Sequence, residues 1–115
     1  MLHPLPSAHL LKCALTHDIP EIITGDVPGP AKVGFLGEAL RLTEQSVSEH
    51  LQLPIPLNKT DAAWLALCDR LDAYLWVREH ANYLTQTPEW QDALESIYIS
   101  AQALDVLDQV KELVD

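Results

Sequence analysis

Hydrophobic residues recur at helical spacing along several stretches of the chain, and no stretch of any length alternates apolar and polar residues as a β-strand would. Ser7 is a suitable N-cap for a first helix that should run to about Ile19, because Pro20 cannot donate a hydrogen bond to the helical ladder. Three prolines and two glycines make 20–32 a loop, and the spacing over 33–51 predicts a second helix. The expected fold class is all-α.

The second half of the chain predicts two more helices. The third runs from about Thr60 as N-cap to about Leu84, and its apolar residues cover nearly the whole circumference, which is typical of a helix buried on both sides. These residues are Trp64, Leu67, Leu71, Tyr74 and Leu75 on one side and Ala62, Leu65, Ala73 and Trp76 on the other. Thr87 as cap and Pro88 at the first position open a last helix that continues to the acidic end. We expect one domain over 1–115.

Charge narrows the range of partners. Among 115 residues, 7 Lys and Arg stand against 17 Asp and Glu, a formal net charge of −10. The basic residues are scattered and form no stripe, which argues against a nucleic-acid or membrane-surface binder. Apolar runs are too short to cross a bilayer, and the start lacks the pattern of a signal peptide. With Cys13 and Cys68 far apart and no C-x-x-C motif, we expect a cytoplasmic protein.

Acidic and imidazole groups occur on helix faces that are otherwise apolar. His17 and Asp18 fall on the Leu10 side of the predicted first helix, and Asp69 projects from an apolar side of the third. A buried carboxylate needs a cation, a hydrogen-bond network or a cleft, since an unpaired one costs several kcal/mol. Two alternatives explain these residues equally well. His17 and Asp18 cap the end of the helix at the surface, or an Arg side chain pairs with Asp69. Alternatively, such donors on neighbouring helices suit a divalent-metal site.

Two segments carry a resemblance to a known family. Residues 15–32, LTHDIPEIITGDVPGPAK, match the pattern HD-x-x-E-x-x-T-G-D-x-P-x-P-x-K at every fixed position, and residues 68–75 read CDRLDAYL. These segments resemble the HD-domain phosphohydrolases, in particular the bacterial 5′-deoxynucleotidases and their phage relatives. The resemblance covers roughly 17–84. It implies an all-α, HD-domain-like helical bundle that hydrolyses nucleoside 5′-monophosphates with one divalent metal, commonly Mn²⁺, Co²⁺ or Mg²⁺.

The resemblance also assigns roles to individual residues. His17, Asp18 and Asp69 match metal ligands, and Glu21 matches the acid that positions or deprotonates the attacking water. The loop that touches sugar and phosphate is matched by Asp26, Val27, Pro28 and Gly29. A metal ion would acidify water and offset phosphate charge in this acidic chain.

One element of the family pattern is missing. The family's first metal-binding His lies on an earlier helix, and neither His3 nor His9 is positioned like it. The segment 46–50, SVSEH, resembles that motif but follows the HD pair. We therefore expect an N-terminally truncated HD bundle with an impaired site, and a homo-oligomer whose interface includes Leu10, Leu65 or Trp76. The alternative is a catalytically silent helical module that acts through dimerisation or a protein partner.

Overall fold

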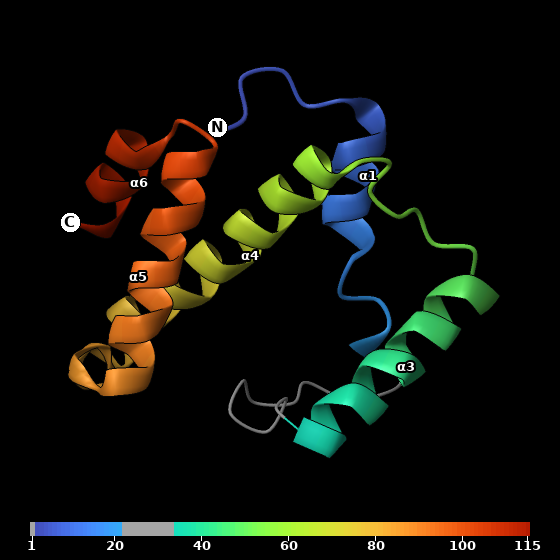
Figure 1. Cartoon of the computed structure of the whole chain (residues 1–115), viewed down its shortest axis with the longest axis horizontal. Helices are drawn as coiled ribbons and strands as arrows, with labels where there is room; N and C mark the ends of the chain where they lie inside the picture. Colours follow the sequence, from blue (N-terminus) through green and yellow to red (C-terminus); the bar gives the residue numbers. More distant parts are fainter. Residues whose placement is uncertain (1, 22–33) are drawn as a thin grey trace. The chain divides into compact units, whose positions relative to one another are not determined.

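The computed structural model describes residues 2–21 and 34–115, the side chains of 34–36 excepted. Every regular element within these ranges is a helix (Figure 1), which confirms the all-α prediction. None of the helices described is long and apolar enough to span a membrane. The chain forms two compact units: residues 7–56, called the inner unit, and residues 1–6 with 57–115, called the terminal unit. The single HD-like domain stays a prediction.

The inner unit begins with helix α1, Ala8–Thr16. Ser7 is its N-cap as predicted, and its hydroxyl accepts a 3.0 Å hydrogen bond from the Leu10 N–H. The helix ends at Thr16, earlier than predicted, and the Ile19 N–H closes a turn on the Thr16 carbonyl. Leu10, expected at an interface between copies, is only 6% exposed.

Helix α3, Gly34–His50, is the second long element of the inner unit and agrees with the helix predicted there. It ends because Gln52 adopts a left-handed backbone, with φ at 55°. The Gln52 and Leu53 N–H groups then donate to the carbonyls of Glu49 and Ser48, which satisfies the last turn of the helix. The predicted loop 20–32 lies mostly outside the described residues, but Glu21 has a helical backbone, unlike the loop expected there.

The terminal unit is built on helix α4, Lys59–His80, which differs from its prediction at both ends. Asn58, not Thr60, is the N-cap, and its side chain accepts a 2.8 Å bond from the Asp61 N–H. After His80 the chain continues as a 3-10 helix, η2, Asn82–Gln86, where a longer α-helix was expected. Next comes helix α5, Pro88–Ala103, followed by α6, Leu107–Val114. Helix α5 packs against both α4 and α6 (Figure 1).

The core of the terminal unit uses one side of α4. The buried side chains of this helix are Trp64, Leu67, Leu71, Tyr74 and Val77. Leu67 is fully enclosed, as are Ile97 of α5 and Val110 of α6. The other side of α4 is not buried: its Ala residues at 62 and 73 are exposed, and Trp76 is 59% exposed. The prediction of burial on both sides is therefore wrong.

The predicted last helix is in fact two helices, because the chain turns at Asp105. This residue has a left-handed backbone, with φ at 60°. Its N–H donates to the Gln102 carbonyl, and the Val106 N–H donates to the Ala101 carbonyl. Val106 and Ala101 are both buried, which supplies the hydrophobic contact that accompanies this type of helix ending. The turn lets α6 fold back against α5.

Asp105→Gly is expected to stabilise the protein by about 1 kcal/mol, because glycine has no Cβ to disfavour a left-handed backbone. Chemical denaturation should show a higher midpoint with an unchanged slope. Asp108→Gly, inside α6, is the matched control and should destabilise by about as much. A lower midpoint for Asp105→Gly would contradict the turn described here.

Candidate metal centre

His17 lies at the C-cap of α1, where its ring is held by the helix itself. Its Nδ1 is 2.6 Å from the Ala14 carbonyl oxygen. Since a carbonyl only accepts, Nδ1 must carry the proton and donate it. In the neutral ring, Nε2 is then the nitrogen with a lone pair, which is the arrangement that orients a metal-binding histidine.

The lone-pair nitrogen of His17 faces a carboxylate. Its Nε2 lies 3.2 Å from Asp18 Oδ1, and the two side chains are 31% and 65% exposed. Two acceptor atoms at this separation repel each other, and a shared proton or cation relieves that repulsion. Protonation gives an ion pair, and a divalent ion gives two ligands from adjacent residues.

The location of the pair corrects the prediction for this region. Because α1 ends at Thr16, His17 is the cap and Asp18 lies beyond the helix, so the pair is not on an apolar helix face. Both residues are exposed, as the surface-capping alternative requires. The end of the helix nevertheless connects the pair to Glu21, whose N–H donates a 3.0 Å bond to the Asp18 carbonyl. Glu21 is half-buried.

Asp69 belongs to the terminal unit, near the middle of α4. Its side chain is exposed, and it shares a helix face with Ala73 and Trp76, at four and seven residues along the chain. That face is apolar as predicted, but it is open to solvent. Partial desolvation raises the pKa of the neighbouring Cys68 thiol, although this residue is exposed. His17 and Asp18 therefore belong to the inner unit, whereas Asp69 belongs to the terminal unit.

Asp26, Val27, Pro28 and Gly29 lie outside the described residues. Two features were not anticipated from the sequence: the Ala14 carbonyl that fixes the imidazole of His17, and a histidine stacked on Trp76. The contact of His17 with the Ala14 carbonyl could not be predicted without knowing where α1 ends. The stacking of His80 on Trp76 is indicated in the sequence only by their four-residue spacing.

Comparison of the chain with protein-family models, with curated proteins and with solved structures finds no match. The resemblance to HD-domain phosphohydrolases thus depends on the residues of the two segments described above.

Proposed function

We propose that this chain is a metal-dependent phosphohydrolase with an HD-domain-like bundle, and that it removes phosphate from nucleoside 5′-monophosphates in the cytoplasm. The observation that carries the proposal is the geometry of His17. The ring donates through Nδ1 to the Ala14 carbonyl and directs Nε2 to within 3.2 Å of Asp18. A metal-binding histidine commonly has this support from a backbone carbonyl.

The donor chemistry fits a divalent cation. His17, Asp18 and Asp69 offer one imidazole nitrogen and two carboxylates, a set that suits Mn²⁺, Co²⁺ or Mg²⁺. All three residues are exposed, so an ion and a substrate could reach them from solvent. When bound, such an ion acidifies water and neutralises phosphate charge. The latter matters in a chain with a net charge of −10, which otherwise repels a phosphate monoester.

The resemblance to HD-domain phosphohydrolases assigns the roles of the residues. His17, Asp18 and Asp69 would hold the ion. Glu21, connected to Asp18 through the backbone hydrogen bond, accepts a proton from the attacking water. By the same resemblance, residues 26–29 would contact the sugar and the phosphate of the substrate.

Phosphate release from a panel of nucleoside 5′-monophosphates tests the proposal. With millimolar Mn²⁺ or Co²⁺ the purified chain should release inorganic phosphate, and excess chelator should abolish the release because the ion supplies the activation of water. His17→Ala protein, purified in the same way, is the control for a contaminating phosphatase. A folded wild-type chain that releases no phosphate with any of these metals would contradict the proposal and favour the silent helical module.

A further inference from the structure

One face of α4 combines a carboxylate with an exposed aromatic stack. Asp69, Ala73, Trp76 and His80 follow one another at spacings of four, three and four residues, so their side chains lie along a single stripe of the helix. All four residues are exposed. We call this stripe the α4 platform. Because it belongs to one helix, its geometry is set by α4 alone.

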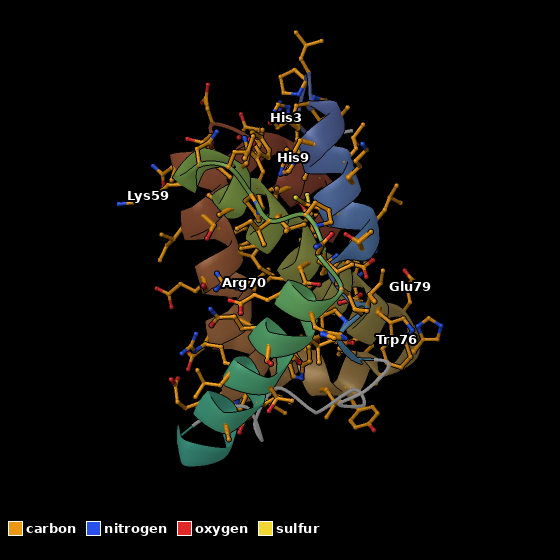
Figure 2. The ribbon with its side chains drawn as sticks, turned by 90° about the vertical axis from the view of Figure 1, so that its right-hand side faces the viewer. His3, His9, Lys59, Arg70, Trp76 and Glu79 are labelled. Atoms are coloured by element: carbon orange, nitrogen blue, oxygen red, sulfur yellow. The ribbon has the colours of Figure 1, made fainter. Side chains whose placement is uncertain are left out.

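Trp76 and His80 form the aromatic end of the α4 platform. Their ring centroids are 4.5 Å apart and their planes differ by 16°, so the rings are stacked. The His80 ring is held in turn, since its Nδ1 lies 2.9 Å from the Trp76 carbonyl oxygen. His80 covers one side of the indole, yet Trp76 remains 59% exposed. Figure 2 shows Trp76 and Glu79 toward the end of α4 opposite Lys59.

An exposed indole that is already ordered is suited to a planar ligand. Aromatic stacking on a base does not require a specific hydrogen-bond pattern, and an ordered ring loses little freedom on binding. The helical rise places Trp76 about 10 Å from Asp69 along the axis. The residue between them on the stripe, Ala73, is too small to obstruct the path. A carboxylate that helps to hold a phosphate-binding ion and a stacking ring at this separation match the two ends of a nucleoside monophosphate.

We propose that Trp76 is the stacking platform for the base of the nucleoside 5′-monophosphate, and that His80 is a positioning residue that holds the indole in place. The inference rests on the proposed function, because that function places the phosphate at Asp69. Trp76 would then recognise the base, whereas the other residues of the proposed site recognise only the phosphate and the sugar.

Kinetics with two substrates test the inference. Trp76→Ala should raise KM for a nucleoside 5′-monophosphate by about 5- to 100-fold and leave KM for ribose 5-phosphate, which has no base, within about twofold. Trp76→Phe should recover most of the affinity, and His80→Ala should raise KM several-fold with kcat unchanged. Tyr83→Ala, which removes an aromatic side chain that is 78% exposed elsewhere in the unit, is the matched control and should change neither KM. Equal KM values in wild type and Trp76→Ala would overturn the inference while leaving the proposed function intact.

A second measurement separates the two claims. Adenosine, which has no phosphate, should quench the indole fluorescence of the wild-type chain, and Trp76→Phe should remove that quenching. This result in a chain that releases no phosphate would support the platform and reject the proposed function. Identical quenching in wild type and Trp76→Phe would overturn the platform.

Discussion

Replacing Asp18 by Ala is expected to lower kcat for phosphate release by about 10³-fold or more. In the proposed site, Asp18 is both a metal ligand and the residue whose carbonyl holds Glu21. The ion supplies several kcal/mol of transition-state stabilisation, and each 1.4 kcal/mol corresponds to about a factor of ten in rate. Asp18→Ala removes a ligand but leaves the backbone hydrogen bond to Glu21 possible, so the loss reports on the carboxylate.

Two further variants interpret that loss. Asp72→Ala removes an exposed carboxylate from α4 that is not in the proposed ligand set, and it should retain activity within about twofold. Glu21→Gln should lower kcat by about 10²- to 10⁴-fold while metal binding persists, because its role is to accept a proton from water. Near-normal activity in Asp18→Ala, measured on protein with an unchanged circular dichroism spectrum, would show that the pair only caps α1.

Much of the helical framework could be predicted from local chemistry. Ser7 and Pro88 mark helix starts both in the sequence and in the structure. Each does so by local chemistry, because the Ser7 hydroxyl accepts a backbone hydrogen bond and the Pro88 ring fixes φ at a helical value. The break at Asp105 could not be predicted in this way. A left-handed backbone is expected of glycine or asparagine, and here it accompanies the burial of Val106 and Ala101, which depends on packing.

The candidate site also combines features that the sequence predicts with features that depend on the folded structure. The residue types at 17, 18 and 69 predict metal-binding chemistry, but the placement of His17 and Asp18 depended on where α1 ends. The helical spacing of about 100° per residue fixes the direction of a side chain only while the helix continues. The early stop at Thr16 therefore moved His17 from a helix face to the cap and Asp18 beyond it. On α4, the spacing of Trp76 predicted an apolar face correctly. It could not distinguish a buried face from an exposed one, because the two have the same periodicity.

The second large effect expected is stabilisation by metal. An ion that binds the folded chain and not the unfolded one stabilises it by about 2.7 kcal/mol at a concentration one hundred times Kd. For a protein of this size that corresponds to a rise in Tm of roughly 10 °C. The rise should disappear in His17→Ala and in Asp69→Ala alike, although the two residues belong to different units.

The thermal melt with and without millimolar Mn²⁺, on wild type, His17→Ala, Asp69→Ala and the Asp72→Ala control, therefore tests the shared metal site most directly. We predict that Mn²⁺ raises Tm in the wild type and in the control and leaves both ligand variants unchanged. A wild-type Tm that Mn²⁺ does not shift, or a shift that survives in Asp69→Ala at full size, would contradict a site built from His17, Asp18 and Asp69.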